Sequence, residues 1–319
     1  MTGARRIVLR NPDLFWPPQR RRAIAPVGRP LTNGSDTGPD IGRGTLKQNQ
    51  RERETMKEVL DLSGRVALVT GAGQGVGRQI ALHLAAHNAG GVVVNDYVLA
   101  RAEAVAEEIR AEGGKALALQ ADVSDHANVK DMVARATTEL GPIGVLVNNA
   151  GNAGATPSAD LGKPFWETSP EVWNSFLGVN LYGVMNCTAA VIPGMIARRA
   201  PGRIITIISD AGRWGDAGLE IYAGAKAGAA GFMRSVARSL GRYEITANSV
   251  AIALTATPAV ERTLNGDPER LKRTLEKYII RRPGRPDDVA NMVLFLASDA
   301  SPWITGQVYP VNGGFSFAL

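Results

Sequence analysis

The sequence reads Arg65-Val-Ala-Leu-Val-Thr-Gly-Ala-Gly-Gln-Gly-Val-Gly77 where a short apolar run meets a glycine-rich turn. The run has the length and composition of a buried strand, and an apolar period with helical spacing follows over Arg78 to Ala89. Glycines at such a turn let backbone amides and the positive end of a helix approach a pyrophosphate. The spacing is Gly71-x-x-x-Gly75-x-Gly77, and Val76 stands where the common GxGxxG pattern has its last glycine. The stretch predicts a strand, a phosphate-binding turn and a helix.

Short β-branched runs alternate with longer helical periods from Asp61 onward, as they do in βαβ units. The expected strands are 65–70, 91–95, 115–120, 144–148, 203–208, 245–250 and 307–311. Together they predict an α/β fold, namely one Rossmann-type, doubly wound domain with a parallel seven-stranded sheet. Ligands are then expected at the carboxyl ends of the strands.

Composition excludes several classes of protein. The chain has 319 residues, of which 45% are hydrophobic and 21% charged, so it does not read as a wholly disordered chain. Cys187 is the single cysteine, which excludes an internal disulfide and a four-cysteine zinc site. No uninterrupted apolar run approaches the roughly 20 residues of a membrane-spanning helix. We therefore expect neither a membrane partner nor a disulfide scaffold.

The net charge of +6 is confined to the first residues of the chain. Residues 1–50 hold nine basic and three acidic side chains, together with six prolines and six glycines. This composition predicts a disordered extension over 1–55 and a folded, formally neutral domain over 56–319, so no nucleic-acid partner is expected. Met56 is an alternative start of the natural product. The extension lacks the apolar stretch of a secretory signal, and its prolines disfavour a mitochondrial transit helix, so the expected location is cytoplasmic.

Polar residues at the ends of the next strands extend the predicted nucleotide site. Asp96 comes 19 residues after Gly77, where a carboxylate accepts hydrogen bonds from an adenosine ribose and repels a 2′-phosphate. The next basic residue is Arg101, so NAD is favoured over NADP as cofactor. Asp122-Val123 and Asn148-Asn149-Ala150-Gly151 follow the third and fourth strands, although ordinary loops also show such residues.

Tyr222 and Lys226 are four residues apart at the start of a helical period, and this spacing puts both on one helix face. A nearby cation favours the ionised form of a phenol, whose ordinary pKa is near 10, so the pair fits a general acid/base. The same spacing also occurs in surface pairs. Ser209 at the end of the fifth strand and Asn180 after the fourth strand favour the catalytic interpretation.

With these residues the chain resembles the short-chain dehydrogenase/reductase family over about residues 61–314, especially alicyclic hydroxyacyl-CoA dehydrogenases and 3-oxoacyl-carrier reductases. The resemblance also rests on an ordered series of shorter motifs. These are Val179-Asn180-Leu181-x-Gly183, Asn248-x-Val250, Gly284-Arg285-Pro286, Phe295-Leu296-Ala297-Ser298, Ile304-Thr305-Gly306-Gln307 and Asn312-Gly313-Gly314.

The resemblance implies hydride transfer between a nicotinamide and an alcohol carbon. It implies that Tyr222 transfers the hydroxyl proton, that Lys226 lowers the pKa of Tyr222 and holds the nicotinamide ribose, that Ser209 binds the substrate oxygen, and that Asn180 anchors a water relay. It implies a cofactor site made of Thr70, Gly71, Gly75, Val76, Gly77, Asp96, Asp122, Val123, Asn149, Ala150, Gly151, Tyr222, Lys226 and Thr257. Arg213 and Trp214 are expected to contact the substrate, because the loop after Ser209 should overhang the nicotinamide.

Two features need separate interpretation. Ile252-Ala253 stands where the family commonly has Pro-Gly, so the following loop is expected to differ, although Thr257 keeps its offset. His83 and His87 have the spacing of metal ligands, but their apolar neighbours favour packing, and no metal site is expected.

The leading hypothesis is an NAD-dependent alcohol dehydrogenase or ketoreductase for hydroxyacyl or ketoacyl thioesters. A steroid or other lipid alcohol is the alternative substrate, and an NAD(H)-sensing regulator is the non-enzymatic alternative. Enoyl reduction is disfavoured, because that branch of the family spaces its Tyr and Lys further apart. Residues 175–197 and 222–240 are apolar around much of their circumference, which predicts pairing between copies in a homodimer or, preferably, a homotetramer.

Overall fold

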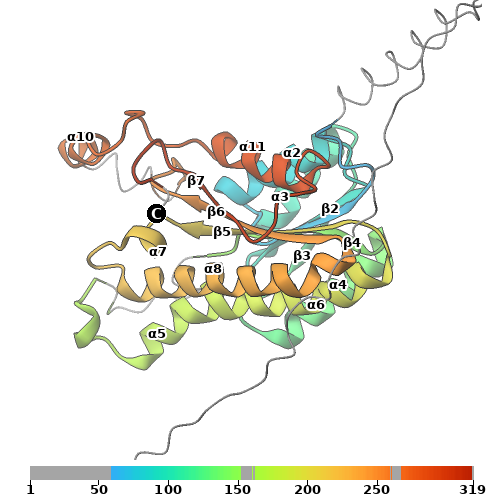
Figure 1. The fold of residues 1–319 in the computed structure, drawn as a ribbon, viewed down its shortest axis with the longest axis horizontal. Coiled ribbons are helices and arrows are strands. Elements are labelled where there is room, and N and C mark those ends of the chain that lie inside the picture. Colours follow the sequence, from blue (N-terminus) through green and yellow to red (C-terminus); the bar gives the residue numbers. More distant parts are fainter. Residues whose placement is uncertain (1–58, 152–159, 161, 259, 261–266, 318–319) are drawn as a thin grey trace, which may run out of the picture. The chain divides into compact units, whose positions relative to one another are not determined.

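Seven strands pair in parallel in the computed structural model, with the order β3-β2-β1-β4-β5-β6-β7 (Figure 1). The strands are β1 (Val66–Val69), β2 (Gly91–Asp96), β3 (Ala116–Gln120), β4 (Ile143–Asn148), β5 (Gly202–Ser209), β6 (Ile245–Ile252) and β7 (Val308–Val311). The chain order reverses between β1 and β4, which is where a doubly wound sheet forms its ligand crevice. The α/β fold class and the seven predicted strands are confirmed.

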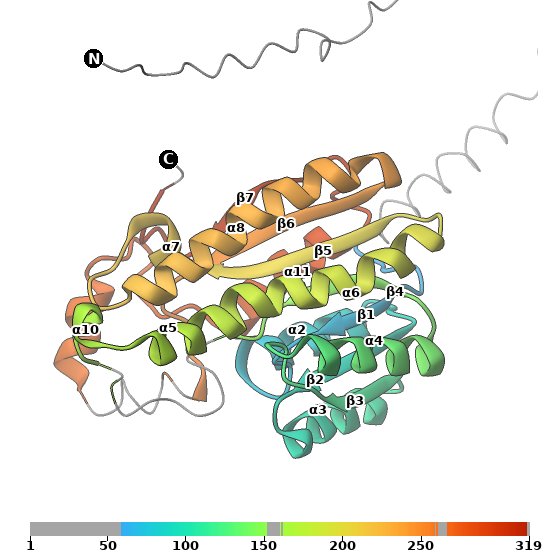
Figure 2. The ribbon, with the colours of Figure 1, turned by 90° about the horizontal axis from the view of Figure 1, so that it is seen from below.

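Helices cover both faces of the sheet, as Figures 1 and 2 show. One face carries α2 (Gly75–Ala86), α3 (Leu99–Ala111) and α11 (Pro286–Ala297). The other carries α4 (His126–Leu140), α6 (Gly183–Ala197) and α8 (Glu220–Leu240). Because both faces are covered, strands such as β1 and β4 are buried along their whole length, and this explains their unbroken apolar sequences.

Shorter helical elements lie beside the carboxyl ends of the strands. These are the 3₁₀ turn Phe165–Glu167, α5 (Pro170–Leu177), a π-helical turn at Gly178–Tyr182, α7 (Ala211–Trp214) and α10 (Pro268–Leu275). The 3₁₀ turn Gly241–Tyr243 instead precedes β6, at the amino end of that strand. The continuous helical run Pro170–Ala197 is long and apolar enough, by length and composition, to cross a membrane. The sequence predicts an apolar helical segment over 175–197 but no uninterrupted apolar run of about 20 residues, because Asn174, Asn180 and Asn186 separate its apolar residues. Within the fold, Val184 and Val191 of this run are buried in the core under the sheet.

The structure describes residues 59–151, 160, 162–258, 260 and 267–317. The expected extension over 1–55 lies outside the described residues. Spatial contacts divide the chain into two units, Met1–Arg51 and Glu52–Leu319.

Candidate active site

The glycine turn after β1 has the backbone geometry of an anion-binding loop. Gly71 and Gly75 have φ values of +60° and +55°, in the left-handed region that favours glycine. A Cβ at Gly77 would lie 2.2 Å from the carbonyl oxygen of Gly71, so only glycine allows this close approach. The following helix α2 has no side-chain hydrogen bond at its N-cap Gln74 and no acidic residue in its first turn. Its first amides therefore suit a phosphate ligand.

Thr70 and Asn149 hold the glycine turn against the end of β4. Thr70 Oγ1 accepts hydrogen bonds from the backbone amides of Asn149 and Ala150, both at 3.0 Å. Asn149 Nδ2 donates to the carbonyl oxygens of Thr70 at 2.9 Å and Gly71 at 3.1 Å. Thr70 itself is buried, so it supports the cleft wall from behind instead of lining it as sequence analysis expected.

A cleft of about 650 Å³ opens beside this turn. Apart from Thr70, every predicted cofactor residue lines it, from Gly71, Gly75, Val76 and Gly77 through Asp96, Asp122, Val123, Asn149, Ala150 and Gly151 to Tyr222, Lys226 and Thr257. Several residues that line the cleft were not predicted from the sequence, namely Gln74, Asn95, Tyr97, Val98, Arg101, Ala121, Val179, Ile207, Ile208, Ile252 and Pro258. A second hollow, around Tyr278, shares no lining residue with this cleft.

Asp96 lies at the predicted ribose end of the cleft, where its carboxylate accepts hydrogen bonds from neighbouring residues. Its Oδ1 accepts hydrogen bonds from Val98 N at 2.9 Å and from the Arg101 guanidinium, with Nη2 at 2.7 Å. Its Oδ2 accepts from Gly73 N at 3.1 Å. Arg101 Nε donates a further bond to Oδ1 at 3.1 Å, so the carboxylate accepts four hydrogen bonds and a ribose hydroxyl would replace one of these donors. Arg101 is the first basic residue after Asp96 in the sequence, and the turn into α3 brings its side chain back to pair with Asp96.

Ile252, which stands where the family commonly has proline, is the last residue of β6. Ile252 pairs in register with Ser209 on one side and with Val311 on the other, and its carbonyl oxygen accepts a hydrogen bond from Asp210 N at 2.9 Å. Thr257 nonetheless reaches the cleft, since a Cβ at Gly75 would lie 3.2 Å from Thr257 Cγ2. The loop therefore keeps the expected position of Thr257.

Tyr222 and Ser209 meet at the carboxyl end of β5. Ser209 is the last residue of that strand, and Tyr222 lies in the first turn of α8. Burial raises the pKa of the Tyr222 phenol, and a hydrogen bond with Ser209 lowers it by a smaller amount. This differs from the expectation that Lys226 lowers the pKa of Tyr222. The physical reason is that burial penalises the phenolate more than its hydrogen bond stabilises it.

Lys226 lies one helical turn beyond Tyr222 and is buried. Its Nζ donates a hydrogen bond to the Ile207 carbonyl oxygen at 2.9 Å and lies 5.8 Å from the centroid of the Tyr222 ring. Burial lowers the pKa of this ammonium group to about 8. A Cβ at Gly151 would lie 3.3 Å from Lys226 Nζ and 3.1 Å from Asn180 Oδ1, so the two polar groups share this corner of the cleft.

Asn180 reaches that corner from the π-helical turn Gly178–Tyr182. Its side chain is fully buried, and Nδ2 donates a hydrogen bond to the Phe176 carbonyl oxygen at 2.9 Å. Single π-helical turns inside α-helices occur often at functional sites. The structure therefore groups the four predicted catalytic residues: Tyr222 and Lys226 line one end of the cleft, and Asn180 and Ser209 lie beside them without lining it.

Sequence comparison shows which proteins this chain is similar to. A family model described as enoyl-(acyl carrier protein) reductase matches residues 71–316. The 3-oxoacyl-[acyl-carrier-protein] reductase FabG of Staphylococcus epidermidis is 38% identical over 249 residues, which are 78% of this chain and 97% of that protein. The chain belongs to the short-chain dehydrogenase/reductase family. The (2S)-[(R)-hydroxy(phenyl)methyl]succinyl-CoA dehydrogenase subunit BbsD of Thauera aromatica is 39% identical over 81% of this chain and 98% of its own length.

Solved structures of short-chain dehydrogenases share the fold. A 7α-hydroxysteroid dehydrogenase in complex with NADH and 7-oxo glycochenodeoxycholic acid has a TM-score of 0.74 and 32% identity, covering 81% of this chain and 96% of that one. A gluconate 5-dehydrogenase from Burkholderia cenocepacia in complex with NADP and tartrate also has a TM-score of 0.74 and 32% identity, over 82% and 99%. This chain is accordingly a short-chain oxidoreductase that acts on CH–OH groups.

Arg213 has a different place in this short-chain dehydrogenase from the one that sequence analysis predicted. Its guanidinium donates to Asp210 Oδ1 at 2.6 Å, to Ser316 Oγ at 3.1 Å and to the Phe317 carbonyl oxygen at 3.0 Å. These partners engage the side chain inside the protein, so we do not assign it to the substrate. Trp214, the second predicted substrate residue, is 62% exposed. Asp210 was not among the predicted site residues. Its one signal in the sequence is that it is an acidic residue directly after the strand that ends at Ser209.

The two histidines with ligand spacing are engaged locally on α2. His87 Nδ1 lies 2.8 Å from the His83 carbonyl oxygen, and His83 Nδ1 lies 3.2 Å from Gln79 Nε2. Within the described part of the chain, no group of three or more His, Cys, Asp or Glu side chains is arranged to hold a metal ion.

Proposed function

We propose that this protein catalyses the reversible, NAD(H)-dependent interconversion of a 3-oxoacyl thioester and its 3-hydroxyacyl thioester. One observation carries the proposal: the cleft that begins at the glycine turn ends at Tyr222, with Ser209, Lys226 and Asn180 around it. When bound, the nicotinamide nucleotide supplies or accepts the hydride. The residues of the chain bind and orient the nucleotide and the substrate, and they transfer the proton.

The proposed proton donor for reduction is the Tyr222 hydroxyl. Because burial raises its pKa, the phenol remains protonated at neutral pH, and this is the form that donates a proton to a carbonyl oxygen. Ser209, which shares a hydrogen bond with Tyr222, is proposed to hold the same carbonyl oxygen. Lys226 is proposed to bind the nicotinamide ribose, and Asn180 to anchor water that returns a proton to the site.

The preference for NAD over NADP rests on Asp96. Its carboxylate lies 4% exposed at the ribose end of the cleft, where a 2′-phosphate would meet a negative charge. The ion pair with Arg101 neutralises part of that charge. The remaining proposed cofactor contacts are the glycine turn, Asp122, Val123, Asn149 to Gly151, and Thr257.

The thioester substrate is supported by the names of two relatives, a 3-oxoacyl-[acyl-carrier-protein] reductase and a substituted succinyl-CoA dehydrogenase. The alternative substrate is a steroid or other lipid alcohol. It is supported by the likeness to a 7α-hydroxysteroid dehydrogenase with a bound 7-oxo bile acid and by the exposed apolar ring of Trp214, which follows Ser209 by five residues in the sequence.

We also propose that the protein acts as a cytoplasmic homotetramer. Only 33% of the most apolar part of the run Pro170–Ala197 is buried. Tyr182 and Met185 on this run are exposed. A second copy is the proposed cover for this apolar face.

A spectrophotometric assay of NADH oxidation tests the proposal. Purified protein should oxidise NADH with acetoacetyl-CoA, and a 7-oxo bile acid should be a much poorer substrate. The reverse preference would favour the lipid alcohol. NADH binding without turnover of either class would favour a nucleotide-sensing regulator.

A further inference from the structure

The loop after β3 carries two of the residues that line the cofactor cleft, Asp122 and Val123. The strand β3 pairs in register with β2, which ends at Asp96. The strand β5, which ends at Ser209 beside Tyr222, lies beyond β1 and β4 in the sheet. The loop therefore forms the wall of the cleft on the Asp96 side, away from the catalytic residues.

Asn186 of α6 holds the backbone of this loop through its side-chain amide. Its Nδ2 donates hydrogen bonds to the Val123 carbonyl oxygen at 3.0 Å and to the Ser124 carbonyl oxygen at 3.2 Å. A primary amide nitrogen has two N–H donors, so one serves each carbonyl oxygen. Asn186 is half-buried and does not line the cleft, so it supports the wall from behind.

The loop itself is a turn closed by Asp122. The Asp122 Oδ1 atom accepts hydrogen bonds from Ser124 N at 2.9 Å and from Ser124 Oγ at 2.7 Å. The Asp122 carbonyl oxygen accepts a further bond from Asp125 N at 3.1 Å. Because the turn is closed in this way, the bonds from Asn186 to two of its carbonyl oxygens also fix the part of the turn that faces the cleft.

The backbone of α6 also approaches the Val123 side chain. A Cβ at Gly183 would lie 2.7 Å from Val123 Cγ2, so a larger residue at Gly183 would displace the valine. Gly183 and Asn186 are three residues apart and therefore share one face of α6. Figure 2 shows this helix beside α4, the helix that follows the loop. One face of α6 thus contacts both the side chain and the backbone of Val123.

We propose that Asn186 is a positioning residue for the nucleotide, because it fixes the wall of Asp122 and Val123 for the adenosine half of NADH. This inference rests on the proposed function, since it takes the cleft as the site of the cofactor. A wall that is fixed before binding does not have to be ordered when the nucleotide enters, and this favours binding. The wall lies on the Asp96 side, so the effect falls on the adenosine half of the cofactor and not on the nicotinamide half.

Ligands that represent the two halves of the cofactor test the proposal by isothermal titration calorimetry. Asn186→Ala should raise the Kd for NADH and for ADP-ribose about fivefold, because the loop must then be ordered during binding. The Kd for reduced nicotinamide mononucleotide should stay within about twofold of wild type. Asn186→Asp keeps the shape of the side chain but presents an acceptor to two carbonyl oxygens, so it should weaken ADP-ribose binding at least as much. With saturating NADH, the kcat for acetoacetyl-CoA should stay within about twofold of wild type in both variants.

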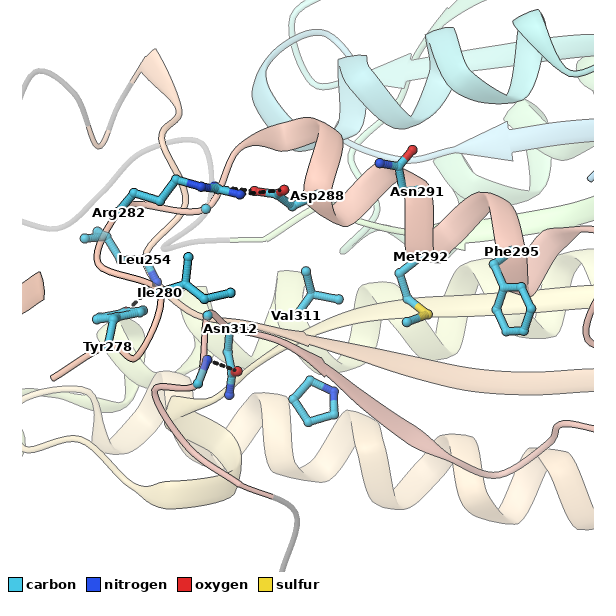
Figure 3. A pocket seen from close by; sticks show the side chains of 14 residues that line it. Leu254, Tyr278, Ile280, Arg282, Asp288, Asn291, Met292, Phe295, Val311 and Asn312 are labelled. Carbon is cyan, nitrogen blue, oxygen red and sulfur yellow. Dashed lines mark hydrogen bonds and ion pairs between the residues drawn. The ribbon is translucent and has the colours of Figure 1, made fainter.

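Asn291→Ala is the matched control for these variants. Figure 3 shows Asn291, a residue of α11, beside the second hollow, which shares no lining residue with the cofactor cleft. The control removes the same side-chain atoms as Asn186→Ala. It should leave the Kd of all three ligands unchanged.

The two halves of the cofactor separate positioning from a general loss of stability. A loosened fold lowers the amount of binding-competent protein equally for both halves. An equal rise of the Kd for ADP-ribose and for reduced nicotinamide mononucleotide would therefore overturn the proposal, and so would an unchanged Kd for ADP-ribose. Asn186→Asp decides the question if Asn186→Ala does not fold. If the wild type binds none of the three ligands, the proposed function fails and this inference fails with it. If the wild type binds them and neither variant changes the Kd for ADP-ribose, only this inference fails.

Discussion

Replacing Lys226 by methionine should stabilise the fold while it abolishes turnover. The ammonium group is buried, and the fall of its pKa from 10.5 to about 8 shows that the folded protein disfavours the charge. This difference corresponds to roughly 3 kcal/mol. Methionine has a similar length and no charge, but it leaves the Ile207 carbonyl oxygen without the donor that Lys226 provides. Losing that hydrogen bond costs about 1–2 kcal/mol, so the expected net gain is about 1–2 kcal/mol at pH 7.

The change of this stability gain with pH tests whether the buried charge of Lys226 causes it. Between pH 8 and 10.5 the unfolded chain binds the Lys226 proton while the folded chain releases it, so the wild type becomes more stable as pH rises through this window. Below pH 8 both states are protonated, and the penalty is constant. The difference between Lys226→Met and wild type should therefore be largest at neutral pH and shrink toward pH 10.5.

Thermal unfolding followed by circular dichroism at several pH values measures this effect. At pH 7 the Tm of Lys226→Met should exceed that of wild type by about 2–6 °C, and its turnover should fall at least about a hundredfold. Lys130→Met, at an exposed lysine of α4, is the matched control and should show no such pH-dependent difference. A Lys226→Met variant less stable than wild type at pH 7, or a difference independent of pH, would refute the argument from burial.

Three other predictions concern the cofactor, the extension and assembly. The wild type should prefer NAD over NADP by about a hundredfold in kcat/KM. Asp96→Ala should reduce this preference, because it removes the negative charge and also frees the Arg101 guanidinium that pairs with it. Equal use of both cofactors by the wild type would contradict the role of Asp96. Deletion of residues 1–55 should leave the Tm and activity unchanged, and a large loss of Tm would show that the extension contributes to the fold. Multi-angle light scattering should give the mass of four chains, whereas a mass near the 33.8 kDa of one chain at micromolar concentration would rule out self-association.

The strands were predictable from the sequence because both faces of the sheet are buried. A doubly buried strand such as β1 or β4 leaves an unbroken apolar run, and the glycine turn marks where the first strand ends. The cleft was predictable for a related reason. Parallel strands bring their carboxyl ends to one edge, so residues that follow different strands, such as Asp96 and Asn149, line one site.

The side-chain pairings were not predictable from spacing alone. Arg101 lies five residues after Asp96, and its return depends on the path from β2 into α3. Arg213 was expected at the substrate, but its partners Ser316 and Phe317 are about a hundred residues away in sequence and become neighbours only through the fold. The π-helical turn that carries Asn180 has no residue signature in this sequence, and the balance of burial and hydrogen bonding that raises the pKa of Tyr222 depends on packing around the phenol.

The central claim is that Tyr222 transfers the proton during reduction of a 3-oxoacyl thioester, and Tyr222→Phe tests it most directly. This substitution removes the hydroxyl and keeps the ring that packs edge-on against Phe176. With NADH and acetoacetyl-CoA, kcat should fall at least about a hundredfold, while the Kd for NADH measured by fluorescence should stay within about threefold of wild type. A variant that retained activity within tenfold of the wild type would contradict the assignment of Tyr222 as the proton donor.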